Sequence, residues 1–227
     1  MNDVVLRHSY SALKQYENCP RRYYLQRITK TVKDVGGEAS LHGERVHKAF
    51  EDRLRDKTPL PDSLKEHEPT VARLEALAEK RNWVLCAEQE LTINVSYAMT
   101  GWWDEDAWLR AKLDVLMVGD DTAAIVDWKT GKRRPDFTQM DIFALMVFLA
   151  YPHVQKVATT FYWLPERATD KRSYHRDDDE GALIVALTSR VSRIERSLET
   201  ETWPAKPSGL CRYCPAQNIC DAARIGA

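Results

Sequence analysis

The sequence lacks a hydrophobic run long enough to cross a bilayer. The longest strongly apolar run, residues 142–151, is about half of the ~20 residues that a membrane helix needs. The N-terminus has no apolar segment of the kind found in signal peptides, and we find no repeats or low-complexity segments. These absences predict a soluble cytoplasmic protein. With 227 residues, 44% of them hydrophobic, the chain is long enough for one compact domain with a sizeable core.

The chain also lacks an excess of charge of one sign. Its formal net charge of -1 gives no long-range attraction to nucleic acid, so any DNA binding must come from local basic patches. The candidates are Arg21, Arg22, Lys129, Lys132, Arg133 and Arg134. For Arg21 and Arg22, a solvated basic face is the alternative interpretation.

Cysteine is scarce, and the five residues present argue against a disulfide framework in a chain without secretory features. Three of them, Cys211, Cys214 and Cys220, have the spacing C-x2-C-x5-C, which is typical of metal or cluster ligation. A zinc ion or a cubane cluster needs a fourth ligand, either Cys19 or Cys86. We favour Cys19, which precedes a proline at a helix end, because Cys86 lies in a predicted strand and resembles a small buried hydrophobe.

The hydrophobic periodicity changes along the chain from a helical to a strand pattern and back. Ser9 or Ser11 is expected to cap a first short helix. Alternation predicts a strand over 83–97, with Val95 on its apolar face, and the tryptophans that follow, Trp102, Trp103 and Trp108, are expected to pack in the core or at an edge. The charged segment 165–179 is expected to be a mobile loop. Further helices are predicted over 41–54, 69–81, 136–149 and 180–199, and a further strand over 154–164.

A β-hairpin over 111–132 carries the strongest chemical signal. Apolar runs over 111–118 and 123–128 flank the turn Gly119-Asp120-Asp121. Because side chains two apart on a strand share a face, Asp127 and Lys129 project together, and antiparallel pairing brings Asp114 alongside. Two carboxylates holding a divalent cation and a lysine beside them suit phosphodiester hydrolysis. Structural salt bridges would produce the same pattern.

Two other polar positions are candidates for the same site. His47 lies on the helix 41–54, where a lone histidine is usually structural or solvated; if it does ligate the cation, manganese becomes more favourable than magnesium. On the strand 83–97, Glu88 or Glu90 is a candidate to face the same cleft as Asp114, although such glutamates usually face solvent.

Taken together, these motifs resemble the PD-(D/E)XK nuclease superfamily, in particular the RecB-like exonucleases with a C-terminal cysteine triplet. The match covers nearly the whole chain, and the motifs follow the family's order. They are Cys19-Pro20, Gly43-x3-His47, Leu113-Asp114, Asp127-Trp128-Lys129-Thr130-Gly131, Gln139-x3-Phe143 and Cys211-x2-Cys214-x5-Cys220.

The resemblance implies a restriction-endonuclease-like α/β core, in which helices flank a central mixed sheet. It implies one nuclease domain over residues 1–227, in which 1–35 and 200–227 form a cluster-binding lobe. It also implies a four-iron four-sulfur cluster on Cys19, Cys211, Cys214 and Cys220, as in the AddB-type and CRISPR-associated RecB-like nucleases; structural zinc is the alternative. For the active site it implies a cation held by His47, Asp114, Asp127 and the Trp128 carbonyl, with Lys129 catalytic.

The match departs from the family pattern at two places. Phe143 stands where the family usually has a tyrosine. The phenylalanine keeps a ring for packing or base stacking but lacks the hydroxyl. The segment Ala111-Lys112-Leu113 lacks the glycine often found before the first acid. Neither departure removes a metal ligand. Gln139 is expected to contact DNA or the attacking water, and Glu88 is expected to be an additional carboxylate, since the family often has a glutamate on the preceding strand.

The sequence therefore predicts a stand-alone Mg2+- or Mn2+-dependent exonuclease that hydrolyses DNA from its ends. The contexts implied by the resemblance are recombination, phage DNA processing and CRISPR spacer acquisition, with proteins of recombination or CRISPR adaptation as partners and the host cytoplasm as the location if a phage encodes the chain. The alternative is a non-catalytic DNA-end-binding iron-sulfur adaptor of a recombination complex.

Overall fold

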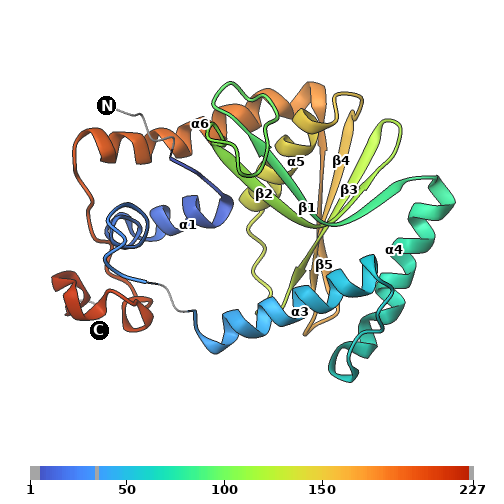
Figure 1. The fold of residues 1–227 in the computed structure, drawn as a ribbon, viewed down its shortest axis with the longest axis horizontal. Coiled ribbons are helices and arrows are strands. Elements are labelled where there is room, and N and C mark those ends of the chain that lie inside the picture. Colours follow the sequence, from blue (N-terminus) through green and yellow to red (C-terminus); the bar gives the residue numbers. More distant parts are fainter. Residues whose placement is uncertain (1–5, 34–35, 225–227) are drawn as a thin grey trace. The chain divides into compact units, whose positions relative to one another are not determined.

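The computed structural model describes residues 6–33 and 36–224 of the chain (Figure 1). The chain divides into two compact units, which we call the sheet unit and the terminal unit. The sheet unit contains residues 37–184 together with the N-terminal residues up to Arg7, and the terminal unit contains residues 8–36 and 185–227. No helix within the described ranges is both long and apolar enough to cross a membrane.

The sheet unit is built on five strands in the order β1-β2-β3-β4-β5. They are β1 (Val84–Ile93), β2 (Leu109–Val118), β3 (Thr122–Lys129), β4 (Lys156–Trp163) and β5 (Ala168–His175). Neighbours pair antiparallel except for β3 and β4, which are parallel. The predicted mixed sheet and its central hairpin are therefore confirmed. Gly119 in the hairpin turn has no room for a side chain, because a Cβ there would collide with the indole of Trp83.

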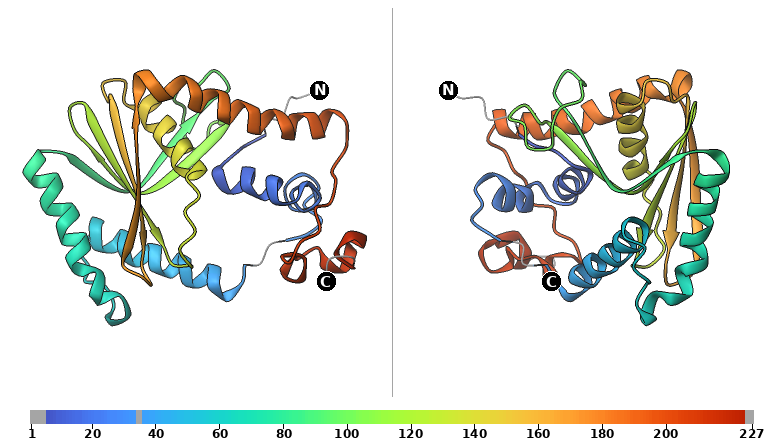
Figure 2. Two further views of the ribbon diagram at one scale, coloured as in Figure 1. Left: turned by 180° about the vertical axis from the view of Figure 1, so that it is seen from behind. Right: turned by 45° about the vertical axis from the view of Figure 1, so that its right-hand side comes forward.

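Helices cover both faces of this sheet (Figures 1 and 2). The helices α3 (Glu38–Arg55) and α4 (Glu68–Arg81), joined through the 3-10 helix Asp62–His67, share a core with β2, β3 and β4 that includes Phe50, Trp128 and Tyr162. On the other face lies α5 (Thr138–Ala150), whose Asp141 accepts a hydrogen bond from the Tyr174 hydroxyl (2.8 Å).

The largest error of the sequence prediction concerns residues 165–179. After a turn over 165–167, residues 168–179 form β5 and the first turn of α6 (Arg176–Glu199) instead of a mobile loop. Most β5 side chains are polar and exposed, so hydropathy gives no strand signal, but an edge strand is held by backbone hydrogen bonds to its neighbour and often carries charge. Val95 lies beyond the end of β1 and is exposed, and Trp103 is 80% exposed instead of packed.

The terminal unit joins segments from both ends of the chain. It contains α1 (Tyr10–Asn18), α2 (Pro20–Tyr23), the π-helical turn Tyr24–Ile28, the part of α6 after Ile184, and the 3-10 turns Cys211–Tyr213, Gln217–Ile219 and Asp221–Arg224. The Ser9 hydroxyl caps α1 by accepting the Ala12 N–H (3.2 Å). Tyr16 donates a hydrogen bond to the Arg193 carbonyl (2.7 Å), and Tyr23 stacks on Trp203.

Candidate metal centre

Asp114 lies where β2 and β3 separate. Backbone pairing between these strands ends at Val115 and Val126. Beyond this pair, the Trp128 N–H is hydrogen-bonded to the Asp114 carboxylate and not to a backbone carbonyl of β2. Asp114 Oδ2 accepts the Trp128 N–H (2.7 Å), and its Oδ1 lies 3.1 Å from Nδ1 of His47 on α3. The end of the ladder thus opens a site at which a helix and two strands meet.

Glu88 completes a group of three possible ligands on the neighbouring strand. Ligand atoms of His47, Glu88 and Asp114 all lie within 4.8 Å of one another. Glu88 is in the middle of β1 but has a φ of 52°, a left-handed conformation that is costly for a residue other than glycine and is concentrated at functional sites. Lys112 forms an ion pair with Glu88 (2.8 Å). Of the two glutamates considered from the sequence, the structure brings Glu88 to the site, while Glu90 is exposed.

Asp127, Lys129 and Gln139 form a second, adjoining cluster. The Lys129 ammonium lies 2.6 Å from Asp127 Oδ2 and donates a hydrogen bond to Gln139 Oε1 (2.8 Å). The Gln139 amide donates to Asp127 Oδ1 (2.7 Å). Gln139 is on the first turn of α5, so this helix fixes both charged groups of β3. The amide contacts the carboxylate and the lysine directly, a connection that the sequence did not reveal.

The charge balance of the site shows that it is short of positive charge. Burial raises the pKa of Asp127, the nearby Asp114 carboxylate raises it further, and Lys129 offsets part of the effect. Burial lowers the pKa of His47, but its hydrogen bond with Asp114 and the surrounding acids outweigh this and raise it. Both directions mean that the site favours protons. A bound divalent cation would satisfy the same demand.

The donor set also fits a divalent cation. Three carboxylates and one imidazole are ligands suited to Mn2+, and the oxygens alone suit Mg2+. Asp127 Oδ2 is buried and accepts no hydrogen bond of good geometry from any residue within the described ranges, although it pairs with Lys129. The Trp128 side chain is buried in the core and stacks on Phe50, so only the backbone of this residue is available to the site.

The residues proposed from the sequence to bind DNA have different surroundings. Phe143 of α5 is only 4% exposed, so its ring packs in the core. Of the two roles expected from the sequence, this is packing, and the buried ring is not available to stack on a base. Arg133 forms a two-point ion pair with Asp170 (2.7 and 2.8 Å), whereas Lys132 is exposed. Arg21 and Arg22 belong to the terminal unit.

The four cysteines selected from the sequence line one small cavity of about 20 Å3 in the terminal unit, together with Arg21 and Arg22. Two of their sulfurs accept backbone N–H groups, Cys19 from Lys206 (3.5 Å) and Cys211 from Ser208 (3.3 Å). Within the described part of the chain, no three of these thiols lie within 4.8 Å of one another. Cys86 is remote in sequence from the other four and lies in β1.

The mixed sheet, with acids and a lysine at the point where its central hairpin opens, defines the class of α/β nuclease cores. The sequence profile of the PD-(D/E)XK nuclease superfamily matches residues 7–221. The chain therefore belongs to this superfamily, as predicted, and is a nuclease by family.

Solved structures share this fold at low sequence identity. The "Putative exonuclease" from Eubacterium rectale matches with a TM-score of 0.55 and 16% identity, covering 98% of this chain and 88% of that one. SSO0001 matches with a TM-score of 0.50 and 15% identity, covering 96% and 87%. No curated protein sequence matches the chain.

Proposed function

We propose that the protein is a Mg2+- or Mn2+-dependent exonuclease that removes nucleotides from DNA ends. The observation that carries this proposal is the convergence, at the open end of the β2–β3 ladder, of the His47–Glu88–Asp114 group and the Asp127–Lys129–Gln139 cluster. A fold relative that bears the name exonuclease supports the choice of exonuclease within the superfamily.

The proposed roles follow from these contacts. His47, Asp114 and Asp127 would hold the cation, with the Trp128 carbonyl as a further donor and Glu88 as an additional carboxylate. The bound cation would supply Lewis-acid activation of the phosphodiester and of water. Lys129 would stabilise the negative charge that develops on the phosphoryl oxygens. Gln139 would keep the Lys129 ammonium oriented and lie close enough to contact the DNA or the attacking water.

Lys129→Met is expected to lower the rate of DNA hydrolysis by about 10²–10³-fold, the usual effect of removing one group that stabilises transition-state charge. The assay compares end-labelled linear DNA with closed circular DNA in Mg2+ and in Mn2+. Lys80→Met is the control, because Lys80 is an exposed lysine of α4 that lies outside the metal centre and outside the basic segment proposed to bind DNA. Linear DNA should be shortened and circular DNA left intact.

The possible outcomes separate the alternatives. Cleavage of the circle would replace the exonuclease with an endonuclease. Tight binding of DNA ends without hydrolysis in either metal would favour the non-catalytic adaptor. Full activity of Lys129→Met would refute the assignment of the lysine.

We also propose that Cys19, Cys211, Cys214 and Cys220 hold a four-iron four-sulfur cluster. All four line the same cavity, and backbone N–H groups directed at two of the sulfurs are the kind of contact that tunes such clusters. A single zinc ion with bonds of about 2.3 Å holds its four sulfurs about 3.8 Å from one another, and structural zinc is the alternative that measurement of the bound metal separates from the cluster. The nuclease contexts of recombination, phage DNA processing and CRISPR adaptation remain expectations from the sequence.

Cys211→Ala is expected to abolish iron and sulfide binding and to lower the stability of the terminal unit, because ligation is coupled to folding. Iron, acid-labile sulfide and visible absorbance would be measured on anaerobically purified protein, together with thermal unfolding. Cys86→Ala removes a thiol that lies outside the cavity and should retain the iron. Stoichiometric zinc without iron in the unsubstituted chain would contradict the cluster, and unchanged unfolding of Cys211→Ala would contradict the structural role.

A further inference from the structure

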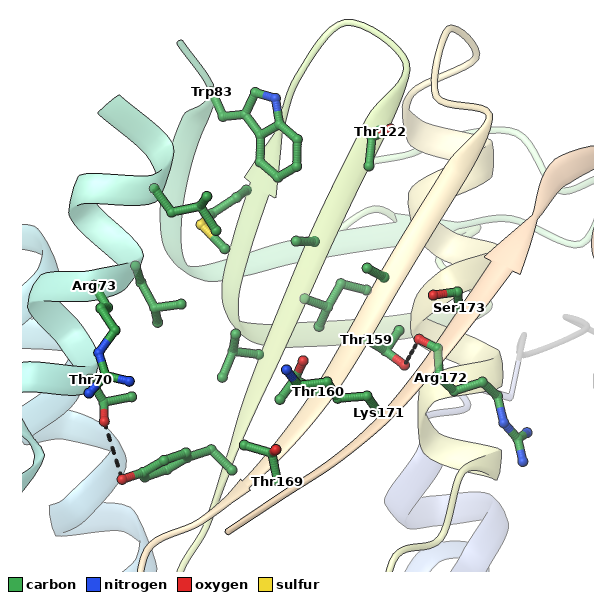
Figure 3. Close-up of a pocket in the computed structure, with 18 of the residues that line it drawn as sticks. Thr70, Arg73, Trp83, Thr122, Thr159, Thr160, Thr169, Lys171, Arg172 and Ser173 are labelled. Carbon is green, nitrogen blue, oxygen red and sulfur yellow. Dashed lines mark hydrogen bonds between the residues drawn. The ribbon is translucent and has the colours of Figure 1, made fainter. Parts of the chain in front are cut away.

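A groove of about 980 Å3 lies in the sheet unit, between α4 and the α4-side face of β3, β4 and β5 (Figure 3). The active-site cluster does not line it. In Figure 3 Arg73 extends from α4 on one side, and Thr160, Thr169 and Lys171 lie on the strands on the other. The groove lies where α4 leaves part of the same face of β4 and β5 uncovered, beyond the contact of Thr70 with Tyr162.

The floor of the groove is mainly apolar and built from small side chains. Its apolar lining includes Leu74 and Leu77 of α4, Met117 of β2, Ala124 of β3 and Ala158 of β4. Small side chains let an approaching backbone come close. Three strands spaced at about 4.8 Å give a floor about 10 Å wide, which matches the diameter of one α-helix.

Cations stand in two rows on either side of this floor. Arg73 and Arg81 are eight residues apart on α4, a rise of about 12 Å. On the sheet side, Lys171 pairs with Thr160, four residues beyond Lys156 on β4, a distance of about 13 Å along the strand. Arg73, Lys156 and Lys171 form no ion pair with any residue in the described ranges. Among the residues that line the groove, Glu66 is the acid, and it pairs with Arg167 (3.5 Å).

We propose that this groove binds an amphipathic helix of a partner protein, with an apolar face flanked on both sides by Asp or Glu. The apolar floor would take the apolar face, and the two rows of cations would each meet one acidic flank. Acids repeated every seven or eight residues along such a helix would coincide with the ~12–13 Å spacing within each row. In a chain with net charge -1, this local excess of cations selects an acidic partner.

A nucleic-acid strand fits the same surface less well. A single strand carries one row of phosphates and stacks its bases on aromatic rings, whereas the groove has two cationic rows. Its two aromatic residues are already engaged: the Arg81 guanidinium lies over the Trp83 ring, and Tyr162 is buried against Trp128. Two hydroxyls that could otherwise donate to phosphates are already used: Thr70 donates to the Tyr162 hydroxyl (3.3 Å) and Thr159 to the Arg172 carbonyl (3.0 Å), as Figure 3 shows.

The test uses a fluorescein-labelled helical peptide of Leu and Ala with Glu on both flanks, titrated against the full-length protein by anisotropy. We expect saturable binding, and at least about tenfold weaker binding to the double variant Arg73→Glu with Lys171→Glu, because two attractive contacts become repulsive. Ala158→Phe, which fills the floor, should also weaken binding. Lys80→Glu, at an exposed lysine of α4 that does not line the groove, should bind within about twofold of the unsubstituted protein.

Each other result overturns the proposal. If the Glu-flanked peptide does not bind saturably, the groove is not a site for such a helix. If a peptide with Lys in place of Glu binds equally well, the cations of the groove do not select acidic flanks. Labelled oligothymidylate that binds here and is displaced by the peptide would assign the groove to nucleic acid. A dimer that sedimentation detects and that the double variant abolishes would assign it to a second copy of the chain. Thermal unfolding of each variant serves as the check on folding.

Discussion

Asp127→Asn should reduce DNA hydrolysis by at least ~10²-fold without destabilising the fold. The substitution removes a carboxylate from the proposed cation site and so removes part of the charge stabilisation that the reaction requires. It keeps the shape of the side chain and its position beside Gln139. Because the carboxylate is buried next to Asp114, its charge opposes folding of the metal-free protein, and an amide at this position avoids that cost.

The pH dependence of the free energy of unfolding should show that the charge of Asp127 destabilises the folded, metal-free protein. Burial and Asp114 raise the pKa of Asp127 in the folded state above its unfolded value of 3.8. The folded state therefore binds the proton more tightly, and this contribution to stability is lost as the pH rises through the folded pKa. In EDTA, Asp127→Asn should be at least as stable as the unsubstituted protein at pH 7, and its advantage should disappear near pH 4.

Asp120→Asn provides the matched control, since Asp120 is an exposed acid in the turn of the same hairpin. This control should retain activity and show no such pH-dependent difference. Retained hydrolysis in Asp127→Asn would remove Asp127 from the site. A large loss of stability at neutral pH would show that its carboxylate is a structural group instead.

Phe50→Ala should destabilise the sheet unit by about 3–5 kcal/mol, the usual cost of removing a buried phenylalanine ring. Phe50 is fully buried and stacks on Trp128 at 4.4 Å between ring centroids. One turn earlier on α3 is His47, so loosening this contact should also weaken cation binding. Urea unfolding and Mn2+ titration would measure the two effects.

Leu41→Ala on the same helix is the control for Phe50→Ala, because Leu41 is exposed and its loss should cost about 0.5 kcal/mol or less. If Phe50→Ala and Leu41→Ala unfold at the same urea concentration, the stacked pair does not stabilise the unit. If the stability falls while Mn2+ binding is unchanged, the position of His47 does not depend on this contact.

The sequence located the central hairpin and the chemical groups on it because both follow from local patterns. Alternation and turn chemistry place Asp114 and Asp127 on adjacent strands, and the register then brings them together. The helix 136–149 was placed correctly to within two residues at its start, and its first turn carries Gln139. These features depend on residues close in sequence or on one strand pair.

Features that depend on distant backbone were not predictable in the same way. β5 is recognisable only from its hydrogen bonds to β4, since its side chains are mostly polar. The left-handed backbone at Glu88 and its ion pair with Lys112 have no signature in residue type, although Lys112 stands two residues before Asp114 on the same strand. For Phe143, the loss of the hydroxyl was visible in the sequence, but the burial of the ring depends on how α5 packs.

The arrangement of the terminal unit has a consequence for the order of folding. Its two segments are separated by the whole sheet unit, and the contact between Tyr16 and Arg193 spans 177 residues. Closing a flexible loop of this length costs about 4–5 kcal/mol of chain entropy, which few early contacts could repay. Once the sheet unit has folded, its ends are fixed and this cost has largely been met. During synthesis, therefore, the core formed by residues 8–36 and 185–227 can form only after the last 43 residues of the chain have been made. Truncation at the C-terminus would leave the first helices without the segment they pack against.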